Sequence, residues 1–195
     1  MKKIFLLTLF ISSLMLAQPI KFGDAKGLFM AVGVGPRFPI SSFGDRNNIG
    51  VGFDVTFSYS DNLLMPIFLY GSIGFEHFPG RQDFYKKSDY SSFSSNVVVV
   101  QGGAKYYFSP IFDDVVLLMP IAEAGVEFAY FEDFHQFKID KDKPSFLSDY
   151  GKFGMHAGVG ISMFVLDVVA YYNYIPDHQY ISFVVKANIP IYVKM

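Results

Sequence analysis

Apolar and polar residues alternate along three long segments of the chain. In Ile49–Ser60 the odd positions are apolar or aromatic, and the even positions are glycine, serine, threonine or aspartate. The same period of two runs through Lys152–Met163 and Ile181–Met195. A period of two sustained over this length predicts β-strands whose two faces lie in different environments.

Five further segments alternate more weakly and bring the predicted strand count to eight. They are Leu28–Ile40, Met65–Phe78, Asn96–Phe108, Val116–Tyr130 and Leu166–Tyr174. Most of the eight reach the ~9–11 residues that a tilted strand needs to cross a bilayer. An even number of strands in an up-and-down order predicts that both ends of the barrel domain lie on the same side of the membrane.

The lengths of the predicted connections support an up-and-down order. The first, third and fifth connections are long, whereas the second, fourth and sixth are short. The long ones are Ser41–Asn48, Pro79–Ser95 and Phe131–Gly151; the short ones are Ser60–Leu64, Ser109–Val115 and Phe164–Val165; the last is Ile175–Gln179. Long outer loops and short periplasmic turns are typical of outer-membrane barrels.

The first residues have the pattern of a signal peptide. Lys2 and Lys3 precede the apolar stretch Ile4–Leu16, and Ala17 offers a small residue for cleavage. The domain organisation predicted is therefore a signal peptide over residues 1–17 and a barrel domain over residues 18–195. A retained anchor is the alternative, although the stretch is short for a spanning helix.

The volume of the side chains indicates which face of the strands points outward. One face is rich in glycine and charge, and the other carries large apolar residues, among them Phe53, Phe57, Tyr59, Phe128, Phe153 and Phe183. An eight-stranded barrel has an interior just wide enough for side chains, so the bulky face would overfill it. In water that face would be a large apolar patch, whereas lipid accommodates it. A soluble lipocalin-type barrel would reverse the distribution. The prediction is an all-β, eight-stranded, antiparallel, up-and-down transmembrane β-barrel.

The chain resembles the small eight-stranded outer-membrane barrels of Gram-negative bacteria, the OmpA/OmpX-like and OmpW-like group. The resemblance rests on the patterns of Leu28–Val34, the turn Tyr59–Asn62, Pro120–Val126 and Ala170–Tyr174. It implies an outer-membrane location and a non-enzymatic structural or surface-binding role. The OmpW-like members imply the alternative of a narrow channel or small-molecule transporter. One departure is the terminal Met195, where many members carry an aromatic residue.

Ionisable residues gather on the face predicted to line the lumen. They are Arg37, Asp54, Glu76, Lys105, Glu123, Glu127, His156, Asp167 and Lys186. One interpretation is a network of paired charges that fills and stiffens the barrel. The other is a narrow path for protons or ions. Glu123 and Glu127 share a face of one strand and need basic neighbours, for which Lys105 on the preceding strand is the first candidate.

No segment indicates catalysis, a cofactor or a metal site. The chain has four histidines and no G-x-S-x-G motif, and the absence of cysteine excludes thiolate chemistry. Asp140, Asp142 and Asp149 could hold Ca²⁺, but the EF-hand spacing is missing. The formal net charge of -2 gives no reason to expect nucleic acid.

The expected partners follow from the location. They are outer-membrane lipid and lipopolysaccharide, the outer-membrane assembly machinery, and a surface ligand that would bind through residues 79–95 and 131–150. Both of these segments mix aromatic side chains with charges of both signs, a composition suited to binding surfaces. The same composition is also the default for solvated loops that face lipopolysaccharide.

Overall fold

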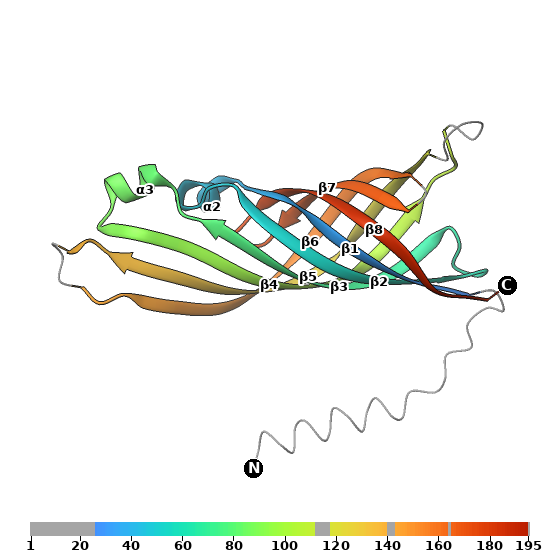
Figure 1. Ribbon diagram of the computed structural model, residues 1–195, viewed down its shortest axis with the longest axis horizontal. Coiled ribbons are helices and arrows are strands. Elements are labelled where there is room, and N and C mark those ends of the chain that lie inside the picture. The colour runs from blue at the N-terminus through green and yellow to red at the C-terminus, as the bar shows by residue number, and fades with distance from the viewer. Residues whose placement is uncertain (1–25, 112–117, 140–142, 164, 195) are drawn as a thin grey trace, which may run out of the picture.

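Eight antiparallel strands close into a single barrel in the computed structural model, which describes residues 26–111, 118–139, 143–163 and 165–194 (Figure 1). The predicted signal peptide lies outside these residues. The strands are β1 (Lys26–Pro39), β2 (Gly50–Asp61), β3 (Ile67–Pro79), β4 (Tyr90–Tyr107), β5 (Leu118–Phe137), β6 (Phe146–Met163), β7 (Leu166–Tyr174) and β8 (Tyr180–Lys194). Two short helices, α2 (Ser41–Arg46) and α3 (Gln82–Lys87), lie in the connections after β1 and β3.

Each strand pairs with the next one in sequence, and β1 pairs with β8 to close the ring. This order is the predicted up-and-down meander. Closure matters because a ring of strands leaves no unpaired edge within lipid. The first residue of β1, Lys26, pairs with Lys194 at the end of β8, so both ends of the barrel wall lie at one rim.

The prediction of two outer loops is wrong, because most of the residues assigned to them lie in strands or in a helix. The segment assigned to the loop Pro79–Ser95 contains α3 and the first residues of β4, which begins at Tyr90. The segment assigned to the loop Phe131–Gly151 is mostly strand, because β5 continues to Phe137 and β6 begins at Phe146. Both segments mix aromatic side chains with charges of both signs, so no clear alternation marked them as strands. Cross-strand pairs such as Phe93 with His135 extend the sheet further.

These extensions form a three-stranded sheet that projects past the barrel. β4, β5 and β6 have 18, 20 and 18 residues, whereas β7 has nine. β6 pairs with β7 only from Met155 onward, so its first residues stand beyond the wall. Figure 1 shows the three strands and α3 extending to the left, at the end opposite the start of β1. We call this part, residues 82–95, 132–139 and 143–149, the outer sheet.

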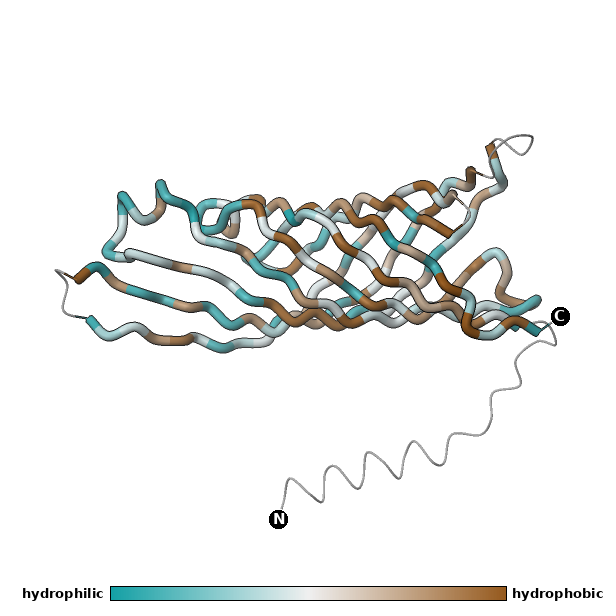
Figure 2. Tube along the Cα trace, viewed as in Figure 1, coloured by the Kyte–Doolittle hydropathy of each residue, from teal (hydrophilic) through white to brown (hydrophobic). Residues whose placement is uncertain are grey.

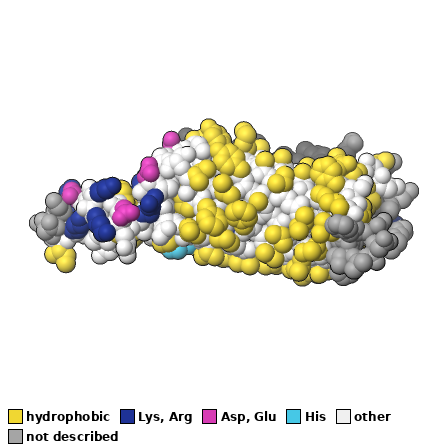
Figure 3. Space-filling view, turned by 90° about the horizontal axis from the view of Figure 1, so that it is seen from above, with side chains coloured by type: hydrophobic (Ala, Val, Ile, Leu, Met, Phe, Trp, Pro, Cys, Tyr) yellow, Lys and Arg dark blue, Asp and Glu magenta, His cyan; other side chains and the backbone are white. Residues whose placement is uncertain are grey.

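The alternation of the strands assigns the two faces as predicted. Phe53 and Phe153 are 54% and 78% exposed, whereas Asp54 and Thr56 on the other face are buried. Figure 2 shows hydrophobic residues running along the barrel strands, with hydrophilic residues more frequent in the outer sheet. In Figure 3 hydrophobic side chains cover the visible barrel wall, whereas charged side chains gather at the outer-sheet end. An exposed belt of this size requires lipid around it.

Among the described residues, no helix is long and apolar enough to cross a membrane.

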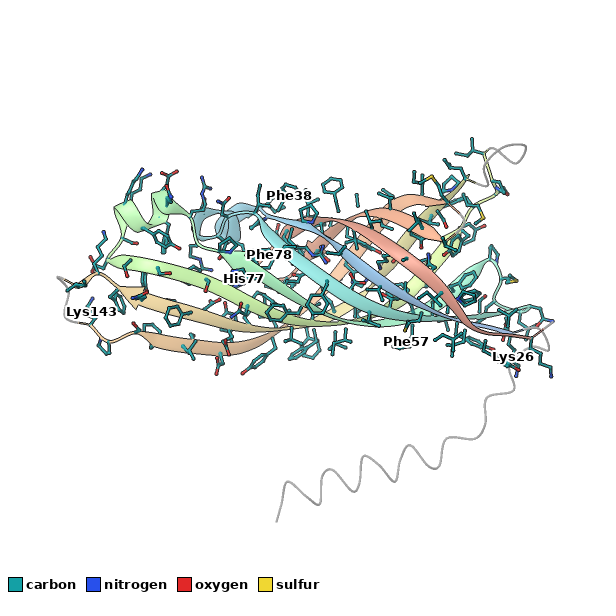
Figure 4. All side chains as sticks on the ribbon, in the orientation of Figure 1. Lys26, Phe38, Phe57, His77, Phe78 and Lys143 are labelled. Atoms are coloured by element: carbon teal, nitrogen blue, oxygen red, sulfur yellow. The ribbon has the colours of Figure 1, made fainter. Side chains whose placement is uncertain are left out.

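The facing of β2 can be tested at two adjacent residues. Phe57 is 48% exposed on the outer wall (Figure 4), and Thr56 beside it is buried and donates to Asp54. We expect Phe57→Arg to lower the free energy of unfolding in lipid vesicles by about 2–4 kcal/mol at the bilayer midplane, and by less near an interface. Phe57→Leu is the matched control and should leave insertion intact. An Arg variant as stable as the Leu variant would contradict the assignment of faces.

Candidate functional site

The lumen brings together all nine ionisable residues that the sequence places on the inward face. Each of them is at most 8% exposed. The strands hold them there because inward positions recur at every second residue of each strand. They form three groups, which differ in how their charges are paired.

The first group lies between β1, β2 and β3. Arg37 Nε donates to Glu76 Oε1 at 2.7 Å, and Arg37 Nη2 lies 3.8 Å from Asp54 Oδ2. Gly52 leaves the space that the guanidinium needs, because a Cβ there would lie 2.9 Å from Nη2. The guanidinium of Arg37 therefore fills the space that the missing side chain of Gly52 leaves on the neighbouring strand.

The second group centres on Lys105. Its Nζ donates to Asp167 Oδ2 at 2.9 Å and lies 3.1 Å from Glu123 Oε1. Lys186 connects the two groups, since its Nζ lies 3.8 Å from Asp54 and 3.9 Å from Glu123. The pairing of Glu123 with Lys105 is the one that strand adjacency indicates. Each of the three cations therefore lies near two carboxylates, and removal of any one of them weakens the charge balance at both.

The third group has no lysine or arginine beside its carboxylate. Glu127 accepts a hydrogen bond from Gln101 Nε2 at 2.9 Å and lies 3.8 Å from His156 Nδ1. The other ring nitrogen of His156 shares a hydrogen bond of 2.5 Å with the Tyr70 hydroxyl. Lys105 therefore forms an ion pair with Glu123, whereas the ionisable side chain beside Glu127 is His156.

Polar side chains that the sequence analysis did not single out complete the network. Tyr171 donates to Glu123 Oε2 at 2.7 Å, while Gln101 and Tyr70 contact the third group. The alternation predicts their inward position, so the available signal was the strand period itself. A cavity of about 20 Å³ beside Arg37, Asp54, Glu76 and Lys186 has room for about one water.

An aromatic cluster closes the lumen between the charges and the outer sheet. Phe43 of α2 is 1% exposed, and its ring centroid lies 4.9 Å from that of Phe78 and 5.1 Å from that of His178. Phe131 and Tyr180, from opposite parts of the wall, belong to the same buried cluster. We call this cluster the outer plug. The sequence analysis missed Phe43 because a six-residue helix within a connection has no alternation to reveal it.

Hydrogen bonds fix the outer plug to the wall. The Tyr150 hydroxyl lies 2.7 Å from Asp133 Oδ2 and 2.8 Å from His178 Nε2. Just after α2, Asn47 Nδ2 donates to the Phe43 carbonyl at 3.3 Å, and Asn47 Oδ1 accepts a hydrogen bond of 3.4 Å from Ser95 Oγ. Burial among these rings lowers the pKa of His178, which lies in the turn between β7 and β8, below its ordinary 6.5. The imidazole is therefore neutral at pH 7.

The described residues hold no group of three histidine or carboxylate side chains suited to a metal ion. Of the three aspartates considered for Ca²⁺, Asp140 and Asp142 lie outside the described part of the chain. None of the side-chain hydrogen bonds described above joins a serine hydroxyl to a histidine.

Solved structures share this architecture. Neisserial surface protein A, from Neisseria, matches with 15% sequence identity and a TM-score of 0.55, over 88% of this chain and 99% of that chain. This chain has the fold of the small eight-stranded outer-membrane barrels. The fold and the exposed apolar belt together place the barrel in the outer membrane.

Two further structures match at lower TM-scores. Ail of Yersinia pestis has 11% identity and a TM-score of 0.47, over 85% of this chain and 99% of that one. The N-terminal β-barrel domain of Pseudomonas aeruginosa OprF has 12% identity and a TM-score of 0.44, over 85% and 99%. No protein-family model and no curated protein matches the barrel sequence.

The Lys105 group provides a test of the lumen network. We expect Lys105→Met to lower the free energy of unfolding by about 3–5 kcal/mol, because Glu123 and Asp167 lose their shared ammonium. Urea unfolding of the refolded barrel in lipid vesicles measures the change. Lys86→Met, on the exposed helix α3, is the control and should cost less than about 0.5 kcal/mol. Equal effects of the two substitutions would show that the lumen charges are not coupled.

Proposed function

We propose that this protein is a non-enzymatic outer-membrane barrel that carries a rigid binding surface, the outer sheet, on a closed scaffold. The observation that carries the proposal is the contrast between the two parts of the molecule. The lumen is closed by the charge network and by the outer plug, whereas three strands continue past the wall. A closed lumen leaves the outer surface as the place for function.

The outer sheet has the composition of a binding surface. Aromatic rings line it in stacked pairs: Tyr90 with Phe137 at 4.8 Å between centroids, and His135 with Phe146 at 4.5 Å. Phe146 remains 46% exposed beside its partner. Aromatic residues are enriched in the cores of protein interfaces, and a polar rim surrounds them.

The outer sheet is also preorganised. Ser91 Oγ donates to the Phe137 carbonyl at 3.0 Å, and Lys138 Nζ donates to the Ser88 carbonyl at 2.8 Å. The ring of Phe84 stacks on Tyr90 at 5.5 Å and so holds α3 against β4. A surface that is ordered before binding loses less conformational entropy when a ligand arrives.

The partners we propose are a ligand of the cell surface at the outer sheet, lipopolysaccharide and lipid around the wall, and the assembly machinery during insertion. Support for the lipid contact comes from the exposed apolar belt. The alternative of a transporter or narrow channel receives little support, because the outer plug and the charge network both lie across the path.

Conductance separates the scaffold from the channel. We expect refolded protein in planar bilayers to show no steady, discrete openings, because the outer plug and the paired charges lie across the described lumen. The matched variant is Phe43→Ala, which empties part of the outer plug but leaves the charge network in place. It should also stay silent. Steady openings of the unaltered protein would overturn the proposal in favour of the channel.

Removal of the outer hairpin tests where binding resides. Replacing residues 136–145 by a short Gly/Ser link should leave heat-modifiable gel migration unchanged, because it removes the far end of the outer sheet and leaves the closed ring of barrel strands intact. Binding to purified lipopolysaccharide, to extracellular-matrix protein and to intact cells is then compared with that of the unaltered chain. We expect any binding of the intact chain to fall.

A control keeps the two parts of the molecule distinct. Glu123→Ala alters the lumen and leaves the outer sheet untouched, so it should lower stability and preserve binding. If the hairpin deletion kept all binding while Glu123→Ala abolished it at unchanged stability, function would belong to the lumen.

A further inference from the structure

A row of three rings joins the strands of the outer sheet. Phe93 of β4, His135 of β5 and Phe146 of β6 lie opposite one another in register. The His135 ring stacks on Phe146 with 4.5 Å between centroids and 6° between planes, and it meets Phe93 edge-on at 5.1 Å. Because β6 pairs with β7 only from Met155 onward, the start of β6 has β5 alone as its neighbouring strand. The ring of His135 is therefore a main side-chain contact for Phe146.

His135 fits this row as a neutral ring. Its Nδ1 is buried and has no hydrogen-bond partner among the residues that the structure describes. Protonation would place an N–H and a positive charge at that atom, and a buried charged donor without an acceptor is costly. The neutral tautomer, with its proton on Nε2, avoids this cost.

Three elements bring charged or titratable groups to His135. Asp133 lies two residues earlier on β5 and has the same facing, Arg46 at the end of α2 lies over the ring of the β4 neighbour, and Tyr90 of β4 lies 5.4 Å away between centroids. The residues opposite on β6 carry no charge. Burial lowers the pKa of His135 below its ordinary 6.5, while Asp133 acts in the opposite direction and Arg46 in the same direction. The ring is therefore neutral at pH 7, and mild acid is the condition that charges it.

We propose that His135 is an acid-sensitive latch of the outer sheet: its neutral ring holds Phe93 and Phe146 together, and in mild acid the charged ring leaves the row and releases the start of β6. The latch rests on the proposed function, since it regulates the binding surface defined there. It lies past the closed ring of strands, so its release leaves the barrel intact.

Acid favours the released state because of where each form of the ring takes up its proton. A released imidazole in water binds a proton at its ordinary 6.5, whereas the stacked imidazole of His135 binds one only at lower pH. Each fall in pH below 6.5 therefore shifts the equilibrium toward release, and the shift levels off once the stacked ring is itself protonated.

A nitroxide at position 147 tests the latch without any ligand. The chain has no cysteine, so Leu147→Cys gives a single labelling site. Leu147 is 57% exposed and lies on the face of β6 opposite to the rings. The full chain is refolded in phosphatidylcholine vesicles, and electron paramagnetic resonance spectra are recorded from about pH 7.5 to about pH 5, within the range in which histidine titrates.

We expect an immobile label at the upper pH and a growing mobile fraction in acid. The ratio of mobile to immobile label should rise by up to about tenfold per pH unit, the limit for one proton. A line shape that does not change over this range would overturn the proposal.

Histidine variants of the labelled chain assign the change. His135→Phe keeps a ring in the row but cannot take up a proton, so the label should stay immobile throughout. His77→Gln on β3 and His178→Gln in the outer plug should respond as the unaltered chain does. Each variant is measured once heat-modifiable migration has confirmed a folded barrel. An acid response that persists in His135→Phe, or that is lost in either glutamine variant, would overturn the assignment to His135.

The latch and the proposed binding function can fail separately. The label reports the order of the outer sheet whether or not the sheet binds anything, so a failure to bind leaves this test unaffected. Where the intact chain binds lipopolysaccharide, matrix protein or cells at about pH 7.5, binding should fall at about pH 5 and persist there in His135→Phe. Full binding by a chain whose label is mobile would show that the latch does not control the surface.

Discussion

The structure depends on one constraint: a closed ring of eight strands in lipid has an interior just wide enough for side chains, and every polar group placed there must find its partner there. The wall satisfies its own backbone through the ring of antiparallel pairs. The interior then has no bulk water to solvate its charges. Arg37, Lys105 and Lys186 are bound by carboxylates from other strands for this reason.

The same constraint divides the lumen into levels along its axis. Aromatic rings around Phe43 close the outer level, paired charges fill the middle, and an apolar cavity opens at the opposite rim. The lumen is too narrow to hold these groups side by side, so aromatic, charged and apolar side chains lie at different heights along the barrel axis. The arrangement separates a closed scaffold from the exposed outer sheet.

The outer sheet shows what happens where the lipid constraint ends. Within the bilayer the outward positions must be apolar and the strands must close into a ring. Past it, β6 continues without β7, and the inward positions of the three strands carry stacked rings and hydrogen-bonding side chains. β4, β5 and β6 therefore extend past the barrel because packing between their side chains, and no longer the thickness of the bilayer, determines their length.

The sequence by itself determined the strand count, the up-and-down order, the facing of each strand and the inward position of all nine ionisable residues. Each follows from a local period of two combined with the volume of side chains such as Phe53 and Phe153. Only the tertiary structure decided the rest. Which side chains form ion pairs or hydrogen bonds depends on how the strands are placed around the ring, and the sequence does not contain that placement. The structure puts Glu127 beside Gln101 and His156. It puts Lys105 between Glu123 and Asp167. The sequence also could not place Phe43 in the lumen, because a six-residue helix has no strand period. It could not extend β5 to Phe137, because the last residues of β5 are paired with residues of the neighbouring strands β4 and β6.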